Sequence, residues 1–114
     1  MAYDLILRGA RVLDPSQNID RVADVAFAGG RVAAVGEGLA AGGAQVEDVR
    51  GLIVTPGLID LHTHVYWGGT SLGIDADDFG RRSGVTTCVD TGSAGPGNFP
   101  GFRKHVIERS DVRI

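Results

Sequence analysis

Two different hydrophobic patterns divide the chain near Thr55. Before this point, short apolar runs alternate with glycine and polar turn residues, a pattern typical of antiparallel strands. Gly29-Gly30 separates two of the runs and predicts a tight hairpin. We therefore expect a small antiparallel sheet of roughly four to six strands. The runs that predict its strands are 3–8, 10–13, 22–27, 31–35, 46–49 and 52–54.

Beyond Thr55-Pro56-Gly57 the pattern alternates between strand and helix. Such alternation is typical of parallel α/β sheets. The successive segments are a strand at 58–65, a helix at 75–83, a strand at 85–90, a helix at 102–109 and the start of a third strand at 111–114.

The expected fold class is therefore α/β, with two parts. Residues 1–55 would form part of a small β-domain, and residues 56–114 would form two βα units and the start of a third strand. Two to three parallel strands make a poor sheet by themselves. We accordingly expect these 114 residues to be the N-terminal piece of a longer protein.

Composition narrows the class of protein. The apolar fraction is 43%, the charged fraction 22% and the net charge −3, which favours a soluble globular protein without nucleic-acid or membrane partners. No apolar run approaches the ~20 residues of a membrane helix, and no secretory signal precedes the first strand, so we expect a cytoplasmic location. The single cysteine, Cys88, lies in an apolar run, which favours a buried structural thiol over a reactive one.

The candidate chemistry lies at His62-Thr63-His64, which holds two of the three histidines. On a strand, Asp60, His62 and His64 would share one face. Neutral imidazoles suit zinc and similar metals, although a catalytic site needs at least a third protein ligand. Asp60 would either hydrogen-bond a ligating ring or ligate the metal itself. The alternative is two hydrogen-bonded polar residues in a half-buried sheet.

The position of the pair favours metal binding. His62 and His64 fall toward the C-terminal end of the first parallel strand, where α/β barrels and open sheets carry their sites. Glycine-rich loops follow this strand and the next one, which suits close approach of a substrate.

The segment 54–64 resembles the first barrel strand of the amidohydrolase superfamily. The family signature Pro-Gly-x-x-Asp-x-His-x-His is present at every fixed position. Segments 4–12 and 30–36 resemble strands of the family's small β-sandwich, and Gly84-Val85-Thr86-Thr87 resembles its second barrel strand. The loops resemble the dihydroorotase-like branch, and within it the amidohydrolase/deacetylase metallohydrolases; they comprise 64–69, 90–95 and 98–103.

This resemblance implies a (β/α)8 barrel of the TIM type with a β-sandwich built from both chain ends. It implies metal-dependent hydrolysis of non-peptide amide C–N bonds or ester bonds, as in a deacetylase or a dihydroorotase-like amidohydrolase, by attack of metal-activated hydroxide on a carbonyl. One or two divalent ions, zinc by expectation, would be held partly by His62 and His64, with Asp60 behind them. The family's carboxylated lysine, two further histidines and aspartate come from later strands, so no catalytic residue is expected here and this chain alone should be inactive.

The resemblance also bears on the neighbouring loops. The partner would be a small acylated molecule, approached by Ser93, Asn98 and Phe99, although plain structural roles are an alternative for all three. Tyr66 and Trp67 would either wall the pocket or pack against the helices.

Two further residues and two other functions stay open. Asp90 would either line the mouth of the site or begin the loop, and His105 is expected on the surface of a helix. The chain could instead belong to a non-catalytic amidohydrolase-like scaffold subunit, or be an inactive truncated remnant. A homo-oligomer is compatible with either kind of protein.

Overall fold

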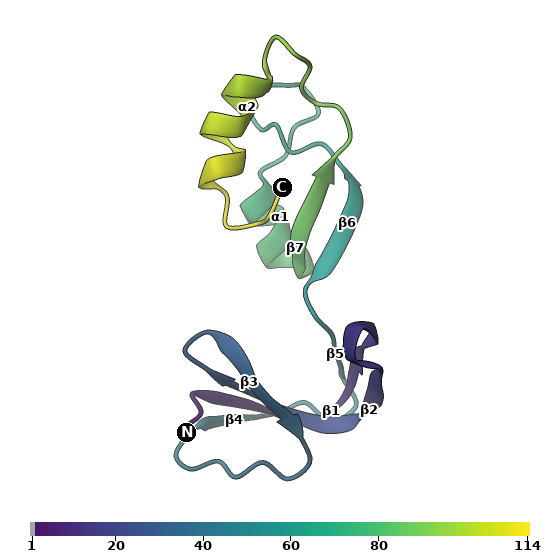
Figure 1. Ribbon diagram of the computed structural model, residues 1–114, viewed down its shortest axis with the longest axis vertical. Helices are drawn as coiled ribbons and strands as arrows, with labels where there is room; N and C mark the ends of the chain where they lie inside the picture. Colours follow the sequence, from purple (N-terminus) through teal and green to yellow (C-terminus); the bar gives the residue numbers. More distant parts are fainter. Residues whose placement is uncertain (1) are drawn as a thin grey trace. The chain divides into compact units, whose positions relative to one another are not determined.

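The computed structural model describes residues 2–114. The chain forms two compact units, of which the first ends at Pro56 and the second begins at Gly57 (Figure 1).

The first unit is a single five-stranded sheet in the order β3-β2-β1-β4, with β5 also paired to β1. Its strands are β1 (Leu5–Asp14), β2 (Ile19–Ala28), β3 (Arg31–Gly36), β4 (Gln45–Asp48) and β5 (Ile53–Val54). A short 3-10 turn at Pro15–Gln17 joins β1 to β2. Gly29 and Gly30 join β2 to β3 with φ angles of 57° and 72°, which only glycine adopts easily, and this confirms the expected hairpin.

The expectation of a wholly antiparallel sheet is wrong, because β4 and β5 both run parallel to β1. The loop after β3 returns the chain past β2 to the far edge of β1, so β4 begins where β1 begins. An irregularity in β1 between Leu7 and Ala10 separates the part that pairs with β4 from the part that pairs with β5. Strand patterns predict which residues are extended, but they do not predict which edge a returning strand joins.

The middle of β2 is buried on both faces and includes a charged residue. Ala23 and Val25 are buried with Phe27 packed against them, on the face that the alternation in β2 predicts, and Ala26 on the opposite face is buried as well. Asp24 is only 5% exposed, and its carboxylate accepts the backbone N–H groups of Gly9 and Leu39, each at 3.0 Å. Asp24 therefore ties the irregularity of β1 to the loop that follows β3.

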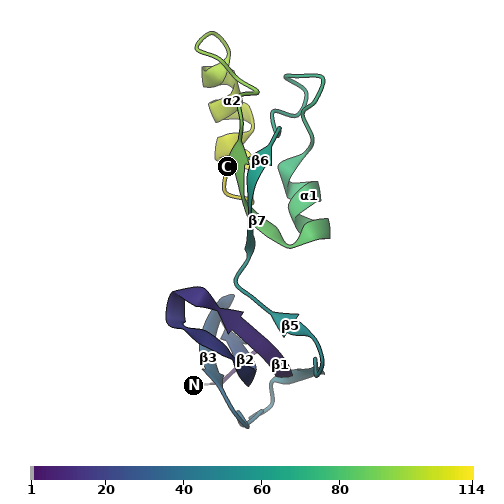
Figure 2. The same cartoon turned by 90° about the vertical axis from the view of Figure 1, so that its right-hand side faces the viewer.

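The second unit is built on two parallel strands, β6 (Leu58–Thr63) and β7 (Val85–Asp90). Helix α1 (Ala76–Ser83) connects them and lies against the strand pair (Figure 2). Helix α2 (Phe99–His105) and a 3-10 turn at Ile107–Arg109 follow β7. The expected third strand appears as one parallel bridge between Thr87 and Arg113.

Helix α1 begins and ends where its sequence predicts. The Asp75 carboxylate accepts the N–H groups of Asp77 and Asp78 at 2.9 Å, which satisfies two of the unpaired donors at the helix start. Gly84 ends the helix with a φ of 75°, a left-handed conformation that disfavours other residues.

Helix α2 differs from its expected range of 102–109. It begins at Phe99 with Pro100 in its first turn, where a missing N–H costs nothing, and the chain tightens into a 3-10 turn after His105. The loop of glycine and proline before it therefore ends three residues earlier than the sequence pattern suggests.

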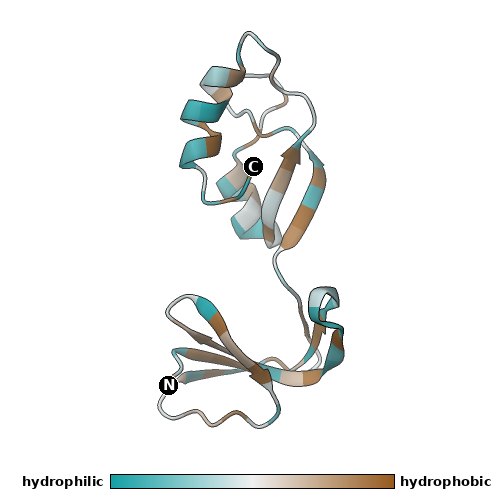
Figure 3. Cartoon of the chain, viewed as in Figure 1, coloured by the Kyte–Doolittle hydropathy of each residue, from teal (hydrophilic) through white to brown (hydrophobic). Residues whose placement is uncertain are grey.

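The core of the second unit joins both helices to β7. It consists of Val65, Ala76, Val85, Cys88, Phe102 and Val112. Strand β6 leaves Ile59 and Leu61 63% and 73% exposed, although buried parallel sheets are covered on both faces. Figure 3, coloured by hydropathy, shows hydrophobic segments on both β6 and β7.

Among the described residues, no helix is both long and apolar enough to cross a bilayer.

Candidate metal centre

His62 and His64 are neighbours at the C-terminal end of β6. His62 is the next-to-last residue of the strand and His64 follows its last residue. Their ring centroids are 5.6 Å apart with planes at 74°; His62 is exposed and His64 half-buried. Two imidazoles on one tetrahedral zinc, with Zn–N bonds of about 2.0–2.1 Å, have centroids about 5 Å apart. The distance between the two rings is thus close to that of two imidazoles on one metal ion.

The third member of the predicted set, Asp60, acts on the backbone here. Its Oδ1 accepts the N–H of His62 at 3.0 Å, so the carboxylate braces the strand rather than a ring nitrogen. Asp60 also pairs across the sheet with Cys88 of β7. Its contact with a ligating ring stays a prediction.

Ser93 makes a contact with the ring of His64. Its Oγ lies 3.0 Å from Nδ1 of His64, although the two residues are 29 positions apart in the chain. Ser93 was predicted on the substrate loop, and the structure places it against a metal-ligand candidate. A hydrogen bond at Nδ1 leaves Nε2 of the same ring available.

Asp90 organises the end of the site. Its carboxylate accepts three backbone N–H groups, from Val65 at 2.9 Å, Gly92 at 3.1 Å and Ser93 at 2.7 Å. Burial acts to raise the pKa of Asp90 and is the largest single influence, but the three N–H groups and the nearby Ser93 hydroxyl together hold the pKa below its usual value. The ionised carboxylate of Asp90 therefore joins the backbone after β6 to the loop after β7 through hydrogen bonds.

From the sequence alone, the role of Asp90 is open between pocket lining and loop start. A local signal is present, since an aspartate followed by Thr91-Gly92-Ser93 is typical of a turn in which the side chain accepts N–H groups two and three residues later. The bond to Val65 spans 25 residues and has no local signal.

Asn98 and Phe99 make contacts within their own segment. Asn98 Oδ1 accepts the N–H of Gly95 at 2.8 Å, which closes the turn before α2. Phe99 lies in the first turn of α2 and meets the ring of Phe102 edge-on. Their approach to a substrate stays a prediction.

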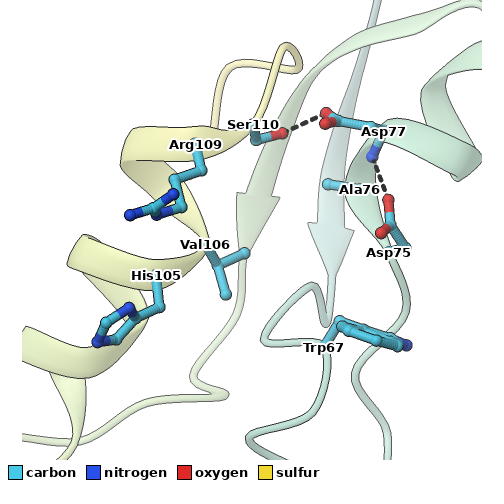
Figure 4. A pocket seen from close by; sticks show the side chains of 8 residues that line it. All are labelled: Trp67, Asp75, Ala76, Asp77, His105, Val106, Arg109 and Ser110. Atoms are coloured by element: carbon cyan, nitrogen blue, oxygen red, sulfur yellow. Dashed lines mark hydrogen bonds between the residues drawn. The ribbon is translucent and has the colours of Figure 1, made fainter.

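The aromatic residues after the histidines separate into two roles. Tyr66 stacks on Phe102 with centroids 4.6 Å apart, so it packs against α2. Trp67 is largely exposed and lines a hollow of about 260 Å³ between the start of α1 and the end of α2 (Figure 4). That hollow is lined by Trp67, Asp75, Ala76, Asp77, His105, Val106, Arg109 and Ser110, and so includes neither His62 nor His64.

Cys88 is buried at 2% exposure, as its apolar run predicts. Burial raises the pKa of its thiol, with a smaller opposing effect of a hydrogen bond involving Thr63. A buried thiol of raised pKa is a poor metal ligand, because metals bind the thiolate. Within residues 2–114, no group of three or more histidine, cysteine or carboxylate side chains is placed to hold a metal ion. The chain supplies two candidate ligands to a site that needs at least one more.

Comparison with known proteins finds relatives both by sequence and by structure. No protein-family model matches the chain. A deacetylase of Agrobacterium fabrum is 48% identical over 86 residues, which cover 75% of this chain and 21% of that protein. A crystal structure of a dihydroorotase superposes with a TM-score of 0.78 and 35% identity, covering 100% of this chain and 30% of that one.

A third relative is an N-acyl-D-glutamate deacylase from Bordetella bronchiseptica, solved with zinc and a phosphonate inhibitor that mimics the tetrahedral reaction intermediate. It superposes with a TM-score of 0.61 and 30% identity, covering 79% of this chain and 19% of that one. The chain thus spans about a fifth to a third of the length of these relatives. By sequence and by fold, the chain belongs to the amidohydrolase superfamily and corresponds to an N-terminal portion of it.

Proposed function

We propose that this chain supplies the first two metal ligands of a metal-dependent hydrolase that cleaves the amide or ester bond of a small acylated molecule. The observation that carries the proposal is the pair of imidazole rings at the end of β6, 5.6 Å apart. The kinship with a deacetylase and a dihydroorotase supports the reaction class, and the zinc in the deacylase relative supports a divalent metal, with zinc as the first choice.

In this proposal the chain's own residues would bind the metal ion and hold its ligands in position. His62 and His64 would each offer a neutral ring nitrogen, and Asp60 would fix the backbone between them through its bond to the His62 N–H. When bound, a divalent ion would polarise the substrate carbonyl and lower the pKa of a water molecule. The further ligands and the proton-transfer group would come from strands of a (β/α)8 barrel that follow this segment in the intact enzyme.

The test uses a protein that carries this chain as its N-terminal part. Its metal content and its hydrolysis of N-acetyl amino acids and of dihydroorotate are measured for the wild type and for a His62→Ala/His64→Ala double variant. We expect the double variant to lose both the metal and the turnover. His105→Ala is the matched control, because His105 is exposed on α2 and should be dispensable.

Two outcomes would contradict the proposal. Unchanged metal content and hydrolysis in the double variant would remove His62 and His64 from the metal site. A protein that binds metal through these residues yet cleaves no amide or ester substrate would instead favour the non-catalytic scaffold.

A further inference from the structure

The contact between Ser93 and His64 bears on which nitrogen of the His64 ring carries the proton. A neutral imidazole carries a proton on one nitrogen and a lone pair on the other, and only the lone pair can bind a metal. The partner at Nδ1, the Ser93 Oγ at 3.0 Å, therefore determines whether Nε2 is free. We propose that Ser93 is a positioning residue that holds His64 in the Nδ1–H tautomer and so keeps Nε2 ready for a metal ion.

The direction of this hydrogen bond follows from the metal site. Nδ1 of His64 is engaged by the Ser93 Oγ, so a metal ion would bind the ring at Nε2. Nε2 then carries the free lone pair and the ring proton lies on Nδ1, which donates to the Ser93 Oγ.

The surrounding backbone keeps both partners in place. The Asp90 carboxylate accepts the Ser93 N–H at 2.7 Å and the N–H of Val65, next to His64, at 2.9 Å. On the other side, the carbonyl of His64 accepts the N–H of Ile74 at 3.0 Å. The Asp90 carboxylate thus holds both Ser93 and the backbone next to His64. This keeps the Ser93 hydroxyl close to the His64 ring.

His62 provides an internal contrast. Its backbone N–H is bonded to Asp60, and its ring meets the edge of His64, but none of the described residues hydrogen-bonds its ring nitrogens. The tautomer of His62 should therefore be independent of Ser93. Ser93 acts on one of the two candidate ligands only.

The first experiment measures the tautomers directly in the metal-free chain. Long-range proton–nitrogen NMR spectra at about pH 8, above the usual histidine pKa of about 6.5, distinguish the two neutral forms. We expect the Nδ1–H form for His64 in the wild type and the Nε2–H form, which imidazole prefers in water, in Ser93→Ala. Ser93→Thr keeps the hydroxyl and should restore the Nδ1–H form, whereas the signals of His62 and His105 should stay unchanged in all three proteins.

The second measurement is a Zn²⁺ titration of the same proteins, followed at the His64 signals. Because loss of an outer partner of a ligating histidine typically weakens metal binding by about 10–100-fold, we expect Ser93→Ala to bind Zn²⁺ about tenfold more weakly than the wild type and Ser93→Thr to bind nearly as well. An Nε2–H form in the wild type overturns the inference without any variant. An unchanged tautomer or an unchanged Zn²⁺ affinity in Ser93→Ala overturns it as well.

This inference rests on the proposed function only in taking His64 as a metal ligand, and the two can fail separately. If the tautomer and affinity results hold but no substrate is cleaved, the proposed reaction fails and the role of Ser93 stands. If hydrolysis requires His62 and His64 but Ser93→Ala leaves the His64 tautomer unchanged, only the proposed role of Ser93 is refuted.

Discussion

Replacing Asp90 should lower the stability of the second unit, because its carboxylate accepts three backbone N–H groups. Val65 is fully buried, Ser93 is half-buried and Gly92 is exposed, so water can replace the bond only at Gly92. An unsatisfied buried donor costs about 1–3 kcal/mol. Asp90→Ala should therefore destabilise the second unit by about 2–4 kcal/mol, and Asp90→Asn, which keeps one acceptor oxygen but turns its NH₂ toward other donors, by about 1–3 kcal/mol.

The assay is urea unfolding followed by tryptophan fluorescence. Trp67 is the single tryptophan and lies in the second unit, so its signal reports on the unit that contains Asp90. With an m-value of about 1 kcal/mol/M for a small unit, Asp90→Asn should lower the urea midpoint by about 1–3 M. Asp111→Asn is the matched control, because the Asp111 side chain is 92% exposed, and its effect should stay within about 0.5 kcal/mol.

The pH dependence of this difference checks its cause. The pKa of Asp90 is lowered in the folded chain, so its contribution is fully present above the unfolded pKa of about 3.9 and is lost as the pH falls through the folded-state pKa. The gap between wild type and Asp90→Asn should be constant from pH 7 to about pH 5 and should close in stronger acid. An Asp90→Asn midpoint equal to that of the wild type at pH 7, or a gap that widens in acid, would refute the reasoning.

Two other substitutions test the two units separately. Asp24→Ala leaves the N–H groups of Gly9 and Leu39 without their acceptor, so the first unit should lose about 2–3 kcal/mol, measured as faster hydrogen exchange in β1 and β2. Gly80→Ala would normally favour a helix by about 1 kcal/mol, yet a Cβ there would stand 2.7 Å from the Val85 carbonyl oxygen, so we expect a lower urea midpoint by Trp67 fluorescence.

Each of these has a control on the same element. Asp20→Ala, on β2 but exposed, should leave hydrogen exchange nearly unchanged; equal effects of Asp20→Ala and Asp24→Ala would contradict the role of the buried charge. Arg81→Ala, exposed on α1, should change stability little. A Gly80→Ala variant more stable than the wild type would show that the space beside Val85 opens easily.

The features that could be predicted from sequence are those with a local physical cause. The Gly29-Gly30 hairpin follows from the φ angles that its turn requires, and the start of α1 follows from the ability of Asp75 to accept two N–H groups. The burial of Cys88 follows from its apolar run. The closeness of His62 and His64 follows from the two-residue period of a strand.

The features that could not be predicted depend on contacts between distant residues. The parallel pairing of β4 with β1 depends on the path of a loop. The bond from Ser93 to His64 joins residues 29 positions apart, and only the folded arrangement of the two strand ends brings them together. Asp60 is nearer in the chain; its carboxylate accepts the N–H of His62, and its role as ring partner or ligand stays a prediction.

The most direct test of the central claim is whether His62 and His64 bind one metal ion together. In a Zn²⁺ titration of the chain followed by NMR, we predict that the ring signals of His62 and His64 shift in parallel with one apparent affinity, while those of the exposed His105 do not move. The affinity should be weak, because the chain supplies two ligands, and either single alanine substitution should abolish the joint shift. Shifts of all three histidines alike, or of neither His62 nor His64, would contradict the account.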